Sequence, residues 1–391
     1  MDRAINLKTI SNVSLTSAIL LALSFLMLSS LLWFDNLVKG QTAAFSNEGN
    51  LSASTSWSES SSPKLFDKVK ASVVQVSPSS NSIISSSLLG SGFVYDKYGH
   101  IITNSHVIEN ASSVTVTFID DTQYDATVIG KDIVNDIAVL ELPENATETI
   151  IPVQFGNSSA ARIGERIFTV GNPYGFSNTL TGGFISQVGR LILETGTIAP
   201  FPHSNMIQTD ALINPGNLGG PLVNLQGLVI GMTTATIDSP HGGATGLGFA
   251  IPSKTLLREV PTLIENGIYD HPWLGISAQN LNPELNKIAG LSPNFKGVLV
   301  DSLVKDGPAD MAGVQGRDEN TQGDIIIALD GVPIKSIHEL LSYIENNKAA
   351  GDKIYVTLNR NNQTNNVVAV LGERPPSPYT SSFISSQTPL F

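Results

Sequence analysis

Residues 214–224 read Asn214-Pro-Gly-Asn-Leu-Gly-Gly-Pro-Leu-Val-Asn224, and this stretch decides the fold that the sequence predicts. Gly216, Gly219 and Gly220 permit backbone angles that side chains forbid. A loop of this composition can aim two backbone N–H groups at a developing oxyanion while a hydroxyl attacks a carbonyl. The residue at the place of that hydroxyl is Leu218, which can neither attack nor donate a proton.

The two other parts of a catalytic triad precede this loop. His106 lies in Thr103-Asn-Ser-His-Val107, and Asp136 lies where a polar turn runs into the apolar stretch 137–140. The chain order of histidine, aspartate and then nucleophile is the order found in double β-barrel enzymes with a Ser-His-Asp triad. In such a triad the histidine takes the proton of the nucleophile, and the aspartate fixes its tautomer. No Ser or Thr occurs between Ala211 and Met232, so a shift of one residue does not restore the missing hydroxyl.

Six motifs that occur in order over residues 64–374 resemble those of the HtrA/DegP family of trypsin-like serine proteases. They are Gly-Ser-Gly-Phe-Val (90–94), Thr-Asn-Ser-His-Val (103–107), Asn-Asp-Ile-Ala-Val-Leu (135–140), Val-Gly-Asn-Pro-Tyr-Gly (170–175), Gln-Thr-Asp-Ala (208–211) and Gly-Leu-Gly-Phe-Ala-Ile-Pro (246–252). The resemblance implies a mostly β fold, a chymotrypsin-like double β-barrel followed by an α+β PDZ domain. Where the family has Asn-Ser-Gly-Gly-Pro-Leu, this chain has Asn-Leu-Gly-Gly-Pro-Leu.

The same resemblance assigns roles to residues of the first domain. His106 takes the position of the base and Asp136 that of the orienting carboxylate, while Leu218 occupies the nucleophile position. Gly216 and Leu218 would supply the N–H groups of the oxyanion hole. The wall of the specificity pocket would be formed by Gly246, Leu247, Gly248, Phe249 and Ala250.

A second domain begins near His271 and resembles a PDZ domain of the HtrA type. Such domains bind an extended peptide as an added strand and hold its C-terminal carboxylate with backbone N–H groups. The resemblance places this carboxylate site at Leu274, Gly275 and Ile276. A pocket on the side of a helix, expected at about 336–346, would be formed by Leu340, Leu341 and Ile344.

An uncharged apolar run covers residues 13–34, after Arg3 and Lys8. As a helix it would be roughly 33 Å long, enough to cross the ~30 Å hydrocarbon core. The preceding basic residues predict a cytoplasmic N-terminus at 1–12 and extracytoplasmic domains in the cell membrane. A cleaved signal peptide is the alternative, although its apolar region is normally shorter, about 7–15 residues.

The sequence also predicts the domain boundaries. After the anchor we expect a Ser-rich linker at 35–63, a protease-like domain at 64–266, a PDZ domain at 271–374 and a disordered tail at 375–391. Within the first domain, 64–76 is expected to be a short amphipathic helix, and 256–266 a helix that closes the domain.

Composition excludes several partners and cofactors. The formal net charge of −12 disfavours binding to nucleic acid and to anionic membrane surfaces. The chain has no Cys, and its His residues show no metal-ligand spacing, so we expect neither a metal nor another cofactor.

Two functions are compatible with the sequence. In the first, the chain is a membrane-anchored HtrA-like homologue in envelope protein quality control, inactive as a protease, that binds unfolded or C-terminal peptide segments. In the second, it is an active serine endopeptidase of misfolded extracytoplasmic proteins, with Leu218 a sequence error or with activity restored in a mixed oligomer. The resemblance also implies assembly as a homotrimer or as a mixed oligomer with an active relative.

Overall fold

The computed structural model describes residues 61–79, 89–109, 111–171, 179–192, 203–214, 216–238, 244–318 and 322–375. The predicted membrane helix at 13–34, nearly all of the predicted linker and nearly all of the predicted tail lie outside these residues. In the described part of the chain, no helix combines the length and the apolar character needed to span a bilayer.

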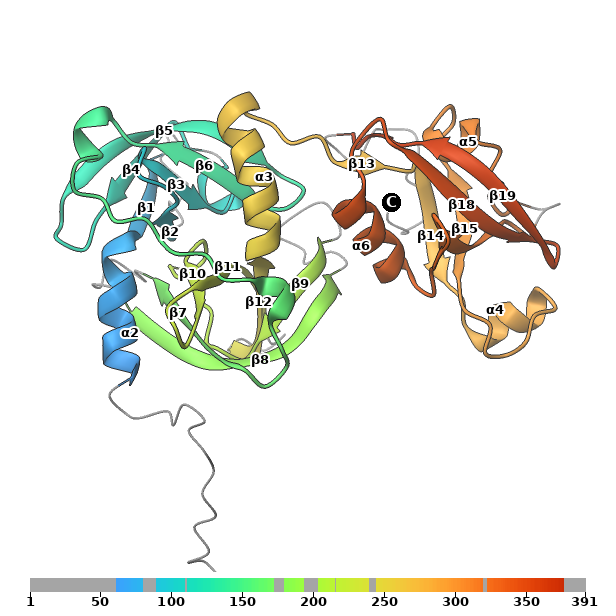
Figure 1. Cartoon of the computed structure of the whole chain (residues 1–391), viewed down its shortest axis with the longest axis horizontal. Coiled ribbons are helices and arrows are strands. Elements are labelled where there is room, and N and C mark those ends of the chain that lie inside the picture. The colour runs from blue at the N-terminus through green and yellow to red at the C-terminus, as the bar shows by residue number, and fades with distance from the viewer. Residues whose placement is uncertain are drawn as a thin grey trace, which may run out of the picture. The chain divides into compact units, whose positions relative to one another are not determined.

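The first domain contains two closed β-barrels, as the sequence predicts (Figure 1). The strands of the first barrel follow the order β1-β2-β3-β6-β5-β4, and those of the second follow β10-β11-β12-β9-β8-β7. The first barrel consists of β1 (Val73–Ser79), β2 (Gly90–Val94), β3 (His100–Thr103), β4 (Ser113–Thr117), β5 (Gln123–Asp132) and β6 (Ile137–Glu141). The second consists of β7 (Arg166–Gly171), β8 (Thr179–Ile192), β9 (His203–Thr209), β10 (Pro221–Asn224), β11 (Val229–Asp238) and β12 (Ala244–Pro252).

Strand β6 shows why the two barrels hold together. Successive side chains of a strand point to opposite faces. Ala138 and Leu140 fill the interior of the first barrel. Ile137 and Val139 face the other way and join a cluster that also contains Phe168 and further residues of the second barrel. This shared core runs between the barrels, so residues at the ends of their strands have fixed relative positions.

Two helices pack on this shared core. Helix α2 (Ser61–Val69) contributes Leu65 and Val69, and helix α3 (Ser253–Asn266) contributes Leu256, Val260 and Leu263. Both helices begin three residues earlier than expected, so their predicted N-terminal bounds were wrong. Helix α2 therefore begins inside the predicted linker. Pro63 is tolerated in the first turn of α2, where its missing N–H leaves no helical bond unmade.

The C-terminal end of α2 also differs from the prediction. The helix ends at Val69, and strand β1 begins at Val73 instead of after Val76. Val73, Val74 and Val76 are all fully buried, and β-branched side chains pack well on a pleated surface.

Helix α3 lies directly against strand β5. A Cβ at Gly130 would lie 2.4 Å from the carbonyl oxygen of Leu263, so only glycine permits this approach. Gly267, with φ of 79°, ends the helix and donates its N–H to Leu263. Its carbonyl accepts the N–H of Lys131 at 3.0 Å. The end of α3 is thereby tied to the residue before Asp132.

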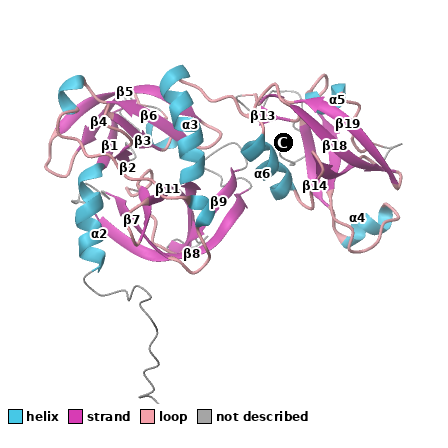
Figure 2. Cartoon of the chain, viewed as in Figure 1, coloured by secondary structure: helices cyan, strands magenta, loops and turns pink. Residues whose placement is uncertain are grey.

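The second domain is the predicted α+β unit (Figure 2). Its buried apolar residues form a cluster of their own, against which the partly buried Leu191 of β8 packs. Its main sheet has the order β14-β15-β16-β18-β19, and β13 pairs with β20. Helix α6 (Ile337–Asn347) begins after Ser336, whose side chain accepts the N–H of Glu339. The remaining elements are β13 (Pro272–Trp273), β14 (Ile276–Asn280), α4 (Pro283–Ile288), β15 (Val298–Leu303), α5 (Pro308–Met311), β16 (Ile325–Leu329), β17 (Val332–Pro333), β18 (Lys353–Arg360), β19 (Gln363–Val370) and β20 (Gly372–Glu373).

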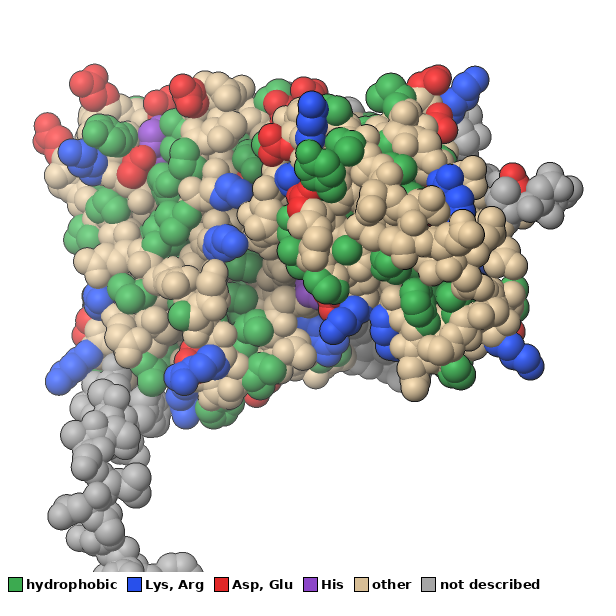
Figure 3. Space-filling model, turned by 45° about the vertical axis from the view of Figure 1, so that its right-hand side comes forward, with side chains coloured by type: hydrophobic (Ala, Val, Ile, Leu, Met, Phe, Trp, Pro, Cys, Tyr) green, Lys and Arg blue, Asp and Glu red, His purple; other side chains and the backbone are tan. Residues whose placement is uncertain are grey.

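Charged side chains are dispersed over the face of the molecule shown in Figure 3. Lys and Arg side chains alternate there with apolar and uncharged surface and form no continuous basic patch.

Candidate active site

The structure brings the predicted base and its orienting carboxylate into direct contact. His106 begins a short 3-10 helix just after β3, and Asp136 lies in the turn between β5 and β6. The Nδ1 atom of His106 is 2.8 Å from Oδ2 of Asp136, and the backbone N–H of His106 donates to Oδ1 at 3.0 Å. The carboxylate thus fixes the orientation of the ring and favours the tautomer with a proton on Nδ1, which leaves Nε2 as a proton acceptor.

Three further groups hold Asp136, and the sequence did not identify them. Ser105 Oγ donates to Oδ1 at 3.1 Å, and Thr234 Oγ1, from β11, donates to Oδ2. Asn104 Nδ2 donates to the backbone oxygen of Asp136 at 3.1 Å. Asp136 itself has φ of 54°, in the left-handed region that aspartate tolerates better than most residues. A carboxylate that is 1% exposed needs such donors, because burial without them is costly.

The charge environment makes His106 a stronger base than an isolated histidine. Burial acts to lower the pKa of His106, but attraction to Asp136 and the hydrogen bond with that carboxylate outweigh it, and Glu109 adds to the effect. The net result is a pKa above the ordinary value for histidine. A raised pKa is what stabilisation of an imidazolium by the neighbouring carboxylate produces.

The loop that carries Leu218 is held in place by hydrogen bonds to β2 and β11. The carbonyl of Leu218 accepts the N–H of Ser91 at 2.8 Å, and the N–H of Gly219 donates to Thr233 at 2.8 Å. Ser91 Oγ donates to the carbonyl of Gly216 at 2.5 Å. Gly216 and Gly219 have φ of 105° and 80°, so both need the freedom of glycine.

Close packing places this loop beside the strand that leads to His106. A Cβ at Gly219 would lie 2.2 Å from the carbonyl oxygen of Ser91 and 2.6 Å from Thr103 Oγ1. The backbone nitrogen of Asn104, the residue after Thr103, lies 3.2 Å from the position of that Cβ. The loop and the His106 turn are therefore adjacent, as a nucleophile and its base must be.

Leu218 is 8% exposed, yet it belongs to none of the hydrophobic clusters among the described residues. Its backbone is tightly held, while its side chain contributes little to the cores of the barrels. Replacing that side chain should therefore be possible without loss of the fold.

The predicted specificity wall lies on β12. Gly246, with φ of 71°, and Leu247 are half-buried, whereas Phe249 and Ala250 are buried in the cores of the barrels. A Cβ at Gly248 would lie 2.6 Å from Cδ1 of Ile213, a residue that the sequence did not single out. Of the predicted wall, 246–247 is the part nearest solvent, and Ile213 lies against the buried Gly248.

The predicted carboxylate site of the PDZ domain forms a turn before β14. Gly275 has φ of 80°, and the carbonyls of Leu274 and Gly275 accept the N–H groups of Ala309 and Val304, both at 2.9 Å. The helix residues predicted to line a pocket are buried in the core of the domain with Leu274 and Ile276; they are Leu340, Leu341 and Ile344.

One more buried histidine was missed. His203, at the start of β9, is 5% exposed, and neither ring nitrogen has a hydrogen-bond partner among the described residues. Desolvation lowers its pKa, so its ring is kept neutral.

Comparison with known proteins agrees with this architecture. The family description "Trypsin-like peptidase domain" matches residues 90–232, and "PDZ domain" matches residues 272–370. The "Probable periplasmic serine endoprotease DegP-like" of Brucella suis is 37% identical over 287 residues, 73% of this chain and 53% of that protein. "Protease Do-like 1, chloroplastic" of Arabidopsis thaliana is 38% identical over 294 residues, 73% of this chain and 64% of that protein. The chain spans about half to two thirds of the length of these relatives.

Solved structures match over nearly their whole length. "HtrA-type protease AlgW with tripeptide" is 33% identical, with a TM-score of 0.69, over 80% of this chain and 97% of that one. The serine endoprotease from Yersinia pestis is 29% identical, with a TM-score of 0.60, over 80% of this chain and 98% of that one. The chain belongs to the HtrA/DegP-type family of trypsin-like serine endoproteases that carry a PDZ domain.

Proposed function

We propose that this chain is a membrane-anchored HtrA-like homologue that binds unfolded or C-terminal peptide segments in envelope protein quality control and does not cleave them. The observation that carries this proposal is Leu218 at the nucleophile position of a site in which His106 and Asp136 are in contact. A base without a hydroxyl or thiol to deprotonate cannot form an acyl-enzyme.

Among the described residues, the hydroxyls of Ser91, Ser105 and Thr234 lie near the site, and each already has a partner. Ser105 and Thr234 both donate to the carboxylate of Asp136, and Ser91 donates to the carbonyl of Gly216. Each of these hydroxyls has a structural partner that it would have to leave in order to attack a substrate. The chain contains no Cys that could substitute.

Peptide binding does not depend on the nucleophile. A PDZ domain holds its ligand through main-chain hydrogen bonds and a carboxylate site. The positive φ of Gly275, in the turn at Leu274–Ile276, supports this role. The apolar run at 13–34 supports the anchor, and relatives described as periplasmic support an extracytoplasmic position of both domains.

The alternative is an active serine endopeptidase, and the intact contact between His106 and Asp136 favours it. The test is incubation of the purified full chain with casein, next to a His106→Ala variant as the matched control. We expect equal and negligible cleavage by both proteins, together with saturable binding of peptides that end in a free carboxylate. Cleavage by the native chain above the His106→Ala control would exclude the non-cleaving function.

A further inference from the structure

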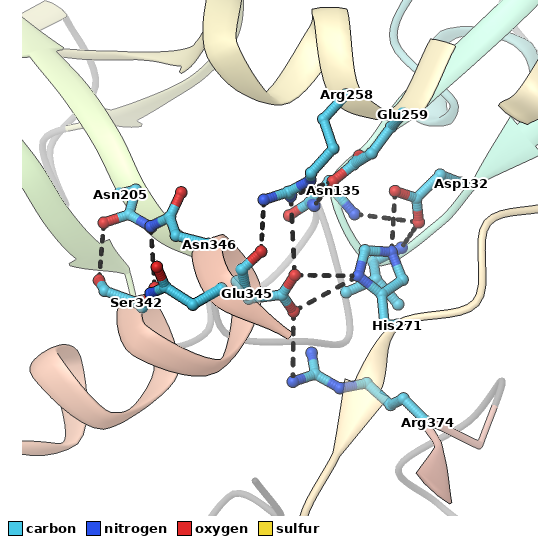
Figure 4. Close-up of polar contacts among 12 residues, drawn as sticks. Asp132, Asn135, Asn205, Arg258, Glu259, His271, Ser342, Glu345, Asn346 and Arg374 are labelled. Carbon is cyan, nitrogen blue, oxygen red and sulfur yellow. Dashed lines mark hydrogen bonds and ion pairs between the residues drawn. The ribbon is translucent and has the colours of Figure 1, made fainter. Parts of the chain in front are cut away.

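A buried cluster of charged side chains lies where the second domain meets helix α3 and the turn after β5 (Figure 4). We call it the junction cluster, and none of its carboxylates or its imidazole is more than 8% exposed. Its members are Asp132, Arg258, Glu259, His271, Glu345 and Arg374.

Three of these residues bring possible metal ligands together. One carboxylate oxygen of Asp132, one of Glu259 and one ring nitrogen of His271 all lie within 4.8 Å of one another. Asp132 ends β5, Glu259 lies in α3, and His271 precedes β13. No histidine spacing in the sequence indicates this group, because the three residues come from segments that only the fold brings together.

In Asp132 and Glu259, the carboxylate oxygen that points away from the shared space already has hydrogen-bond partners. Oδ1 of Asp132 accepts the N–H groups of Val134 at 2.8 Å and of Asn135 at 3.2 Å. Oε1 of Glu259 accepts Asn135 Nδ2 at 2.9 Å and also the guanidinium of Arg258. The side chains are therefore oriented, and Oδ2 of Asp132 and Oε2 of Glu259 are left for the shared space.

Glu259 supplies the observation that points to a ligand. Its side chain is fully buried, and its Oε2 atom has no hydrogen-bond partner among the described residues. Two buried carboxylates that face each other repel unless a proton or a cation lies between them. Desolvation, followed by the charge of Asp132, raises the pKa of Glu259 to about 8.

We propose that Oδ2 of Asp132, Oε2 of Glu259 and Nε2 of His271 bind one divalent transition-metal ion of the zinc class. One imidazole nitrogen with two carboxylates is a donor set of zinc and similar ions, whereas calcium and magnesium take oxygen ligands alone. The other ring nitrogen, Nδ1 of His271, lies 3.4 Å from Glu345. A carboxylate behind a metal-binding histidine is the usual support for such a ligand, because it fixes the tautomer that leaves Nε2 free.

The two carboxylates beside His271 hold its ring in place. The ring bridges Asp132, at 3.0 Å, and Glu345. Burial acts to lower the pKa of His271, but Asp132 and Glu345 outweigh it and raise that pKa to about 10.

The ion would join elements of both domains. Asp132 begins the turn that contains Asp136, and His271 is the first residue before the strands of the PDZ domain. A cation at this place would therefore cross-link the PDZ domain to the segment that orients His106.

The test uses the full chain without a histidine tag, stripped with a chelator and titrated with Zn²⁺ alone by calorimetry. We expect one ion bound per chain and a higher midpoint of thermal unfolding.

Variants distinguish this site from adventitious binding. His271→Gln and Glu259→Gln should each weaken Zn²⁺ binding at least about a hundredfold, and Glu345→Gln about 10–100-fold. The matched control is His100→Gln, which removes another histidine–aspartate pair, with Nδ1 of His100 at 2.6 Å from Asp96, and should leave binding unchanged.

Absence of saturable binding, or binding that survives Glu259→Gln, would overturn the proposal. Glu259→Gln preserves the shape of the side chain and decides the question even where His271→Gln does not fold.

Discussion

Asp136 contacts His106 through both of its carboxylate oxygens, one on the ring nitrogen Nδ1 at 2.8 Å and one on the backbone N–H at 3.0 Å. This double contact fixes both the ring and the main chain of the histidine. Such an arrangement serves a reaction in which the ring becomes charged. In this chain it is retained beside Leu218, which offers the ring no proton to take.

The first prediction concerns the glycine that brings the Leu218 loop against β2. Gly219→Ala should destabilise the protein by more than about 3 kcal/mol, because the new methyl group would lie 2.2 Å from the carbonyl oxygen of Ser91. Gly164→Ala is the matched control, since its φ of 87° is similar but nothing lies within 4 Å of the added atom. That change should cost only the strain of the left-handed backbone, about 1–2 kcal/mol. Urea unfolding measures both, and equal losses would show that the loop yields to the clash.

The second prediction concerns Thr234, which donates to the buried carboxylate of Asp136. Thr234→Val keeps the shape of the side chain but removes this donor, so we expect a loss of about 1–3 kcal/mol in the free energy of unfolding. Thr236→Val, on the same strand, is the control and should change stability much less. A loss no larger than that of the control would mean that the hydroxyl is dispensable to Asp136.

The third prediction is the pH dependence of a variant with a restored nucleophile. The new serine of the Leu218→Ser variant can be deprotonated only by a neutral His106. Burial acts to lower the pKa of His106, but Asp136 outweighs this effect and raises the pKa. The value of kcat/KM should therefore be low in acid and rise with pH through an apparent pKa above 6.5. Adding Asp136→Asn should lower that apparent pKa and reduce kcat by about 10⁴. A profile with an apparent pKa well below 6.5 would contradict the assigned role of Asp136.

The fourth prediction concerns the PDZ domain. Peptides ending in an apolar residue should bind the full chain with micromolar affinity, about −8 kcal/mol, measured by fluorescence anisotropy. Amidation of the peptide C-terminus should abolish binding, because it removes the charge that the turn at Leu274–Ile276 would hold. Gly275→Val should weaken binding as well, since φ of 80° strains a β-branched residue. Equal affinity for acid and amide would place the ligand elsewhere.

The resemblance of the ordered motifs to one family was sufficient to predict two barrels followed by a PDZ domain. The contact between His106 and Asp136 was predictable from the same motifs, since His106 lies shortly after β3 and Asp136 directly before β6, and these two strands pair. The hydrogen bond from the hydroxyl of Thr234 to Asp136 was not predictable, because threonine is common in strands and Asp136 belongs to the other barrel. The bounds of α2 depend on packing against the shared core, which the local sequence does not contain.

The junction cluster was the largest omission. His271 was expected only to mark the start of the second domain, and Asp132 only to open a turn. Their distance of 3.0 Å depends on the end of α3 being tied to β5 through Gly267 and Lys131. Contacts between segments so far apart in the chain carry no periodic signal in a single sequence.

The central claim is that Leu218 alone separates this site from a working serine protease. The most direct test is labelling with a fluorophosphonate probe, which reacts with an activated serine. The native chain should not react with the probe, whereas the Leu218→Ser variant should. This variant should also cleave casein at least a hundredfold faster than the double variant Leu218→Ser, His106→Ala. The gain should remain below the ~10⁶ in rate that an intact triad contributes. Labelling of the native chain, or a folded Leu218→Ser variant no more reactive than its His106→Ala control, would contradict the claim.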